Sequence, residues 1–193
     1  MKLLNMKIRY NAPTVLTFAI ISTALLIVNQ TIFRGIIPAW FTVGGRGSFN
    51  PATVHSWVTI FTHVLGHVEW NHLFANFAFI LILGPILEES YSSRLLLVMI
   101  ILTALVTGVL NVLLFKTALL GASGVVFMMI LLASFTNFSK GEIPLTFILV
   151  LIIYLGREFV HSFSTNNISE FAHIVGGFCG SLYGFFRPGK KLS

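Results

Sequence analysis

The sequence predicts an all-α membrane protein built as a bundle of six transmembrane helices. Of its 193 residues, 56% are hydrophobic and 9% are charged, whereas soluble domains carry about 25% charged residues. The mean hydropathy is +0.91. Long apolar runs alternate with short polar links, as in multi-span proteins. We therefore expect one helical domain over residues 1–193, embedded in a lipid bilayer.

The apolar runs define the predicted spans. The first run is longer than the apolar region of a signal peptide and no small-residue cleavage site follows it, so we expect an uncleaved helix. A long outer loop at about 34–70 combines Gly, Pro and Trp, which is typical of a segment that lies on the outer leaflet and partly dips into it. The expected spans are about 12–33, 71–87, 95–115, 121–138, 143–160 and 171–187.

The positive charges predict the orientation of the chain. Eight of the twelve basic residues fall on the side of the two termini, and four fall on the other side. The positive-inside rule then places both termini in the cytoplasm, and the short loops suit a multi-pass protein of a bacterial inner (cell) membrane. Because the basic residues form no patch, we expect no nucleic-acid partner. The sequence predicts no particular oligomeric state.

Residues 121–124, Gly-Ala-Ser-Gly, have two interpretations. Small residues let two membrane helices pack closely, and the tetrapeptide alone favours this reading. Alternatively, Ser123 is a nucleophile with space for a substrate beside it. A helix from Ser123 to about Phe138 would be about 24 Å long, shorter than a hydrocarbon core of about 30 Å. Its start would then lie below the outer membrane face.

Polar groups gather at the depth of this serine. The second span begins with His67, His72 and Asn76, and the sixth span begins near His173. Polar groups within spans usually face the interior of the bundle or a hydrated cavity. Together with Ser123, these side chains predict one hydrated site at the outer ends of three spans.

His173 begins a stripe of glycines, with Gly176, Gly180 and Gly184 at +3, +7 and +11. These positions share one helix face, so a neighbouring helix can approach closely. A lone histidine here would more often bond to backbone, but beside Ser123 it fits a general base. The sequence contains no aspartate, which leaves a Ser-His dyad. His72 and Asn76, four residues apart, supply candidate donors to an oxyanion.

Four motifs resemble those of the rhomboid intramembrane serine proteases over nearly the whole chain. They are Gly-Ala-Ser-Gly at 121–124, Ala-His-Ile-Val-Gly at 172–176 continuing to Gly180, the set His67, His72 and Asn76, and Gly-Pro-Ile-Leu-Glu at 84–88. The resemblance implies a rhomboid-like bundle without cofactor or metal, whose substrates are transmembrane segments admitted past residues 155–170. It implies that Ser123 is the nucleophile and His173 the base. The implied oxyanion site comprises His72, Asn76 and Gly121, with His67, Gly124, Gly176 and Gly180 in support.

The chain departs from the family pattern at two places. Trp57-Val58 stands where family members often have Trp-Arg, and Glu170 precedes the histidine by one turn, where a small or neutral residue is common. We expect Glu170 to face water. His63 is predicted to anchor a loop and Asn111 to make an interior hydrogen bond.

The sequence can be compared with what three other functions would require. A metal-dependent protease could use His63 and His67, but the sequence has no His-Glu-x-x-His motif. A transporter would predict paired half-helices in both halves of the chain, and no such symmetry occurs. A catalytically silent rhomboid-like protein that only binds transmembrane segments would be expected to lack Ser123 or His173.

Overall fold

The computed structural model describes residues 9–135, 145, 148–149, 152–153 and 167–186. Within these ranges the chain is helical, with a single β-bridge between Val43 and Leu119 and no strand. This confirms the predicted all-α class. The elements are α1 (Pro13–Thr31), α2 (Ile36–Trp40), α3 (Val54–Thr62), the 3-10 turn η1 (His63–Leu65), α4 (Trp70–Tyr91), α5 (Ser93–Leu114), α6 (Ser123–Ser134) and α8 (Asn167–Phe186).

The helices have the composition of membrane spans. Three of them, α1, α4 and α5, are long and apolar enough to cross a bilayer, and α6 and residues 171–186 of α8 are shorter apolar helices. Large apolar side chains such as Ile82 and Phe178 point outward and are more than half exposed. A helix that is apolar on its outer face as well as its inner face is expected where lipid replaces water. The predicted fifth span, 143–160, lies mostly outside the described residues.

Two helices extend beyond their predicted ends. Helix α4 continues to Tyr91 instead of ending at 87, because the buried carboxylate of Glu88 accepts the backbone N–H groups of Thr14 (2.8 Å) and Val15 (3.1 Å). The Glu88 carboxylate therefore lies at the positive N-terminus of α1, whose N–H groups take the place of water. Helix α8 begins at Asn167 instead of 171, since a helix satisfies its own backbone beyond the apolar core. Residues 167–170, the last part of the expected gate at 155–170, are therefore helical.

The segment expected to be a long loop, at about 34–70, contains α2, α3 and η1. Helix α2 is joined to the end of α1 by the Asn29 side chain, whose oxygen accepts the N–H groups of Gly35 and Ile37, each at 3.1 Å. Trp57 donates its indole N–H to the Pro51 carbonyl (3.1 Å), so the tryptophan of the altered pair is held by its own segment. The outer segment is therefore a folded cap.

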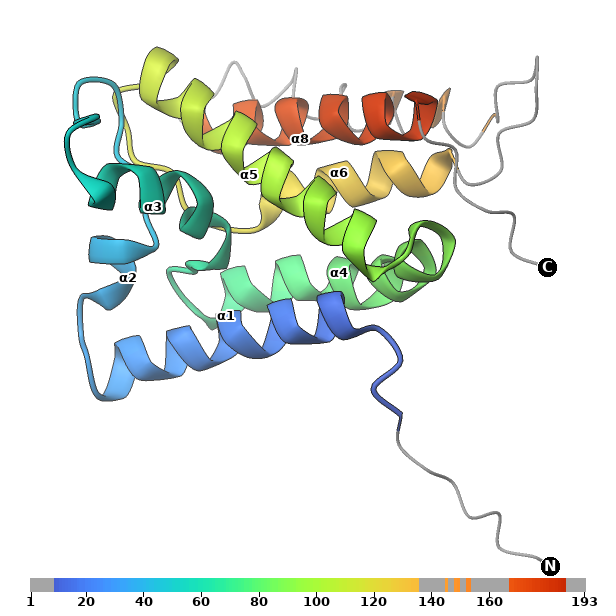
Figure 1. Ribbon diagram of the computed structural model, residues 1–193, viewed down its shortest axis with the longest axis horizontal. Helices are drawn as coiled ribbons and strands as arrows, with labels where there is room; N and C mark the ends of the chain where they lie inside the picture. The colour runs from blue at the N-terminus through green and yellow to red at the C-terminus, as the bar shows by residue number, and fades with distance from the viewer. Residues whose placement is uncertain (1–8, 136–144, 146–147, 150–151, 154–166, 187–193) are drawn as a thin grey trace, which may run out of the picture.

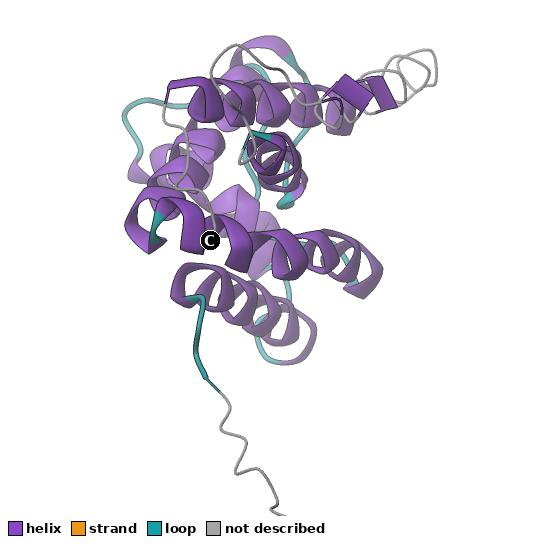
Figure 2. Ribbon diagram, turned by 90° about the vertical axis from the view of Figure 1, so that its right-hand side faces the viewer, coloured by secondary structure: helices purple, strands orange, loops and turns teal. Residues whose placement is uncertain are grey.

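Figure 1 shows how these helices are arranged: α2 and α3 gather at one end of the bundle, and the start of α1 and the end of α8 lie toward the other. Helix α6 begins well inside the bundle, and residues 124–132 are all buried. Its 12 residues correspond to about 18 Å, too short for a core of about 30 Å. Figure 2, turned by 90°, shows that nearly all of the described chain is helical, with loops in teal between neighbouring helices. Ser123 therefore starts a helix in the interior of the bundle.

Candidate active site

Ser123 is the first residue of α6, as predicted. The turn before it requires Gly121, whose φ of +113° lies in the left-handed region. A Cβ on Gly121 would come within 2.7 Å of the His72 ring. No side chain caps α6, so the first N–H groups of the helix have no partner within the helix. The half-buried Ser123 side chain thus lies beside unpaired helical N–H groups and the His72 imidazole.

One side of this loop is held by hydrogen bonds. The N–H of Gly121 donates to the carbonyl of His63 (2.9 Å). The His63 ring is buried and pairs through Nδ1 with the Ile60 carbonyl (2.9 Å) and through Nε2 with the Thr107 hydroxyl (3.3 Å). The prediction that His63 anchors a loop is confirmed. The N–H of Gly121 is therefore already bonded, and the missing Cβ of this residue leaves room for His72.

Asn111 adds a second set of bonds on this side. Its Nδ2 donates to the carbonyls of Gly44 (3.2 Å) and Thr117 (3.0 Å), which confirms the predicted interior hydrogen bond. These carbonyls belong to the outer segment and to the chain leading into α6. Thr107, which bonds to His63, also lies beside the start of α6, because its methyl group would be 3.3 Å from a Cβ on Gly124. We call His63, Thr107 and Asn111 the polar anchor.

The other side of the loop is held by α8, the principal neighbour of α6. A Cβ on Gly176 would overlap the carbonyl of Gly124, and one on Gly180 would overlap the carbonyl of Met128. A Cβ on Gly184 would overlap the ring of Phe135. We call Gly176, Gly180 and Gly184 the glycine seam. It lets α8 approach the backbone of α6 itself, as the sequence predicts.

Close packing along the glycine seam positions His173 beside the start of α6. The His173 ring stacks on Phe127, with ring centroids 4.2 Å apart and planes inclined by 3°. Phe127 lies four residues after Ser123 and so on the same helix face. His173 therefore lies over the first turn of α6, on the face that carries Ser123. The contact of Phe127 with His173 was not predicted from the sequence. The signal for it is an aromatic residue one helical turn after the serine.

His72 and Asn76 complete the cluster from α4. His72 lies against Gly121, beside the start of α6. Asn76 is buried, and its Nδ2 donates to the His72 carbonyl (3.0 Å). A carboxamide has two N–H donors, and within the described residues Asn76 makes only the bond to the His72 carbonyl. His72 and Asn76 thus lie one turn apart on α4, with His72 at the turn before Ser123 and His173 over the first turn of α6.

His67 supports this cluster from below His72. Its ring meets the His72 ring edge-on, with centroids 5.0 Å apart, and its Nδ1 lies 3.2 Å from the Leu65 carbonyl. Burial lowers the pKa of His67 and of His63 to about 4. Both precede the spanning helix α4, and both rings are neutral at pH 7. A neutral His67 can pack against His72 without repelling a proton there.

Two predicted features are not placed. The side chain of Glu170 and most of the expected gate, residues 155–170, lie outside the described residues. Among the residues that are described, no group of three or more His, Cys, Asp or Glu side chains is arranged to hold a metal ion.

The fold and this cluster define a helical membrane protein in which a histidine of α8 lies over the first turn of a buried helix that begins with Ser123. Comparison with known proteins gives the family. The family model of the Rhomboid domain matches residues 54–189, and the chain belongs to the rhomboid family. It is 24% identical over 127 residues to the rhomboid protease GlpG of Haemophilus influenzae, a match that covers 64% of this chain. The match spans 66% of that relative, just under two thirds of its length.

Proposed function

We propose that this protein is an intramembrane serine endopeptidase that uses Ser123 and His173 as a catalytic dyad. Membership of the rhomboid family supports a protease of this class. The observation that carries the proposal is the stack of His173 on Phe127, one helical turn from Ser123. It holds an imidazole over the helix face that presents the serine, which is what a general base requires.

In the proposed reaction, Ser123 Oγ attacks the carbonyl carbon of the scissile peptide bond, and its proton passes to the His173 imidazole. The tetrahedral intermediate collapses, the C–N bond breaks, and the imidazolium returns that proton to the departing amine. Water then attacks the acyl-enzyme and gives a proton to His173. The ester bond breaks, Ser123 regains its proton, and the new carboxylic acid leaves.

The oxyanion of each intermediate requires preorganised donors. His72 packs against Gly121, the free N–H of Asn76 is available, and the N–H groups at the start of α6 add a positive helix end. Removing one such donor typically lowers kcat by about 10²–10³. We assign His72, Asn76 and the Ser123 N–H to this role, with Gly121 making room for the ring.

The proposed substrates are transmembrane segments of other membrane proteins. A peptide bond inside a helix must be unwound before Ser123 can reach it, so helix-destabilising residues near the cut should favour cleavage. The buried start of α6 supports a reaction within the membrane thickness. With the predicted orientation, the site opens toward the outer side of an inner membrane, and both termini are cytoplasmic.

The test is cleavage of a labelled transmembrane substrate by the full chain in proteoliposomes. We expect Ser123→Ala and His173→Ala each to abolish cleavage while the thermal unfolding transition is kept. Ser134→Ala, at the other end of α6, and His55→Gln, in the outer segment, are matched controls that should stay active. Full cleavage by either dyad variant contradicts the proposal. A wild-type protein that binds the substrate without cutting it would establish the catalytically silent alternative.

The oxyanion assignment has its own test. We expect His72→Ala and Asn76→Ala to lower kcat by about 10²-fold or more with little change in KM, because these donors act on charge that develops in the transition state. A rise in KM at unchanged kcat would assign both residues to substrate binding instead.

A further inference from the structure

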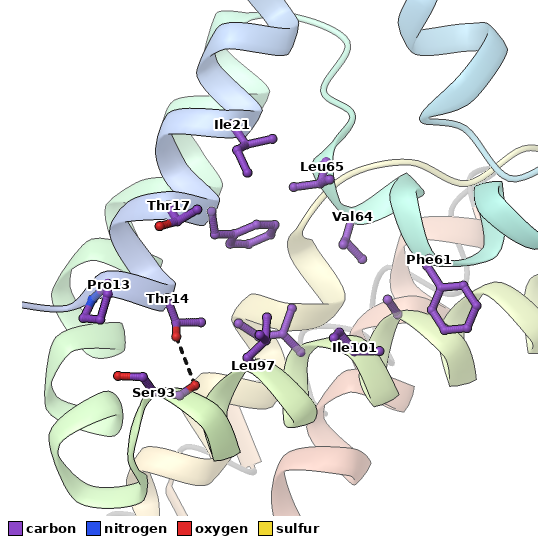
Figure 3. A pocket seen from close by; sticks show the side chains of 13 residues that line it. Pro13, Thr14, Thr17, Ile21, Phe61, Val64, Leu65, Ser93, Leu97 and Ile101 are labelled. Atoms are coloured by element: carbon purple, nitrogen blue, oxygen red, sulfur yellow. Dashed lines mark hydrogen bonds between the residues drawn. The ribbon is translucent and has the colours of Figure 1, made fainter.

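A second hollow lies on the side of α1, away from Ser123. It is an apolar cleft of about 430 Å³ between α1 and α5, covered at one end by α3 and η1. Figure 3 shows Ile21 from α1 and Leu97 and Ile101 from α5 lining its walls, with Val64 and Leu65 closing the end. At the other end the Thr14 hydroxyl donates to the Ser93 carbonyl (3.0 Å). The cleft therefore has apolar walls, a closed end and a polar base.

A polar hollow of about 640 Å³ adjoins this base. It is lined by Arg9, Asn11, Glu88, Glu89 and Ser93, with Pro85 and Ile86. Ser93 lines both spaces. The chain passes from one to the other between Asn11 and Pro13. Tyr10, which is 58% exposed, bonds through its hydroxyl to Thr17 at the rim of the cleft (2.8 Å). An exposed tyrosine between an apolar and a polar space is typical of the membrane interface.

The charged side chains that line the polar hollow differ in whether they already have bonding partners. Glu88 is buried and already accepts two N–H groups at the start of α1. Arg9 and Glu89 are exposed, and neither makes a salt bridge or hydrogen bond within the described part of the chain. One cation and one anion thus remain free beside the base of an apolar cleft. That combination complements a molecule with an apolar tail and a head group that carries both charges.

We propose that this composite site binds a glycerophospholipid with an amine-bearing head group, from the leaflet at the end of the bundle where α1 begins. The guanidinium of Arg9 pairs with the phosphate, for which its planar donors are suited. The carboxylate of Glu89 pairs with the ammonium. One acyl chain lies between α1 and α5 and ends below Val64 and Leu65. This site is separate from Ser123 and does not depend on the proposed protease activity.

The shape of the cleft favours an acyl chain over a transmembrane helix. A helix that crosses the bilayer needs a groove along the whole hydrocarbon core of about 30 Å. This cleft is covered by Phe61 of α3 and by Val64 and Leu65 of η1, and it does not continue past them. An acyl chain ends within its own leaflet, so it fits a cleft that is closed on that side.

The experiment is native mass spectrometry of the full chain released from nanodiscs of equimolar phosphatidylethanolamine and phosphatidylglycerol. We expect the wild type to retain one lipid, chiefly phosphatidylethanolamine. Arg9→Gln should weaken retention of both lipids by about tenfold, the effect of losing one charge-assisted bond. Glu89→Gln should abolish the preference for the amine while the phosphate is still held. Leu97→Trp should fill the cleft and release both lipids.

Matched variants keep the test specific. Arg94→Gln removes an exposed cation from the start of α5 that does not line either space, and Leu102→Trp enlarges a side chain of α5 outside the cleft. Both should retain lipid as the wild type does. Equal retention by the wild type, Arg9→Gln and Leu97→Trp would overturn the site. Equally tight binding of soluble glycerophosphoethanolamine would overturn it too, since that molecule has no acyl chain.

Discussion

The two sides of the loop that carries Ser123 are held by different kinds of contact. On the α8 side, the glycine seam brings backbone against backbone, and an added methyl group at Gly176 would overlap a carbonyl of α6. On the side of η1 and α5, the polar anchor uses hydrogen bonds of 2.9–3.3 Å from His63 and Asn111. A packed backbone cannot move aside, whereas a hydrogen bond typically contributes about 1 kcal/mol. The seam should therefore tolerate less change than the anchor.

The largest effect is expected from Gly176→Ala. The new Cβ would meet backbone atoms of Gly124 that have no freedom to shift, so α8 must separate from α6 and carry His173 away from Ser123. Overpacking costs about 1–3 kcal/mol, and more where backbone is involved. We expect a destabilisation of about 3 kcal/mol or more and loss of cleavage, measured by denaturant unfolding in detergent and by the substrate assay.

Gly177→Ala is the matched control for the seam. One residue further on, a Cβ would lie 3.6 Å from the Leu131 side chain, an ordinary van der Waals contact. Alanine also favours a helix by up to about 1 kcal/mol over glycine. Gly177→Ala should be as stable as the wild type or more so. Equal destabilisation by both variants would contradict the steric account of the seam.

The polar anchor predicts a dependence of stability on pH. Burial lowers the pKa of His63 from 6.5 to about 4 in the folded protein. Between these values the unfolded chain binds the proton more readily, so stability is complete above about pH 6.5 and is lost as the pH falls toward 4. The loss in the free energy of unfolding reaches about 3 kcal/mol at pH 4. Unfolding free energies at pH 7 and 4.5 should show this loss, and His63→Gln should reduce it.

His55→Gln provides the comparison for the pH experiment, because His55 is an exposed histidine of the outer segment. It should leave the pH dependence unchanged. A pH dependence that is the same in His63→Gln as in the wild type would show that the buried ring of the anchor is not its source.

The smallest effect is expected at the stack of His173 on Phe127, beside the glycine seam. Phe127→Leu keeps an apolar side chain under His173 but removes the stacked ring, and an aromatic pair contributes about 0.5–1.5 kcal/mol beyond buried area. We expect kcat to fall by about fivefold with an unchanged KM. Phe135→Leu removes a buried ring of the same helix segment away from His173. It should lower stability without lowering kcat.

Helical spacing in the sequence predicts those features that depend on residues close together in the chain. The start of α6 at Ser123 and the face shared by Gly176, Gly180 and Gly184 both follow from helical spacing, and the structure has both. Contacts between distant segments were not predictable in this way. The extension of α4 past Glu88 depends on α1, some 74 residues earlier in the chain. The bonded N–H of Gly121 likewise depends on the carbonyl of His63.

The outer segment shows the same limit. Its glycines, prolines and tryptophans indicate an interfacial loop. In the structure Asn29 accepts N–H groups at the start of α2, and the Pro51 and Trp40 carbonyls accept donors from Trp57 and Thr62 of α3. Helices of five and nine residues are too short to be stable alone. Tertiary contacts decide their structure, and composition does not reveal those contacts.

The central claim is that Ser123 is a nucleophile activated by His173, and covalent labelling tests it most directly. The full chain in proteoliposomes is treated with a fluorophosphonate, and the modified peptide is identified by mass spectrometry. We predict a single adduct on Ser123, formed in the wild type and in Ser134→Ala and absent in His173→Ala. An adduct on another residue, or labelling of Ser123 at the wild-type rate in His173→Ala, would contradict the account.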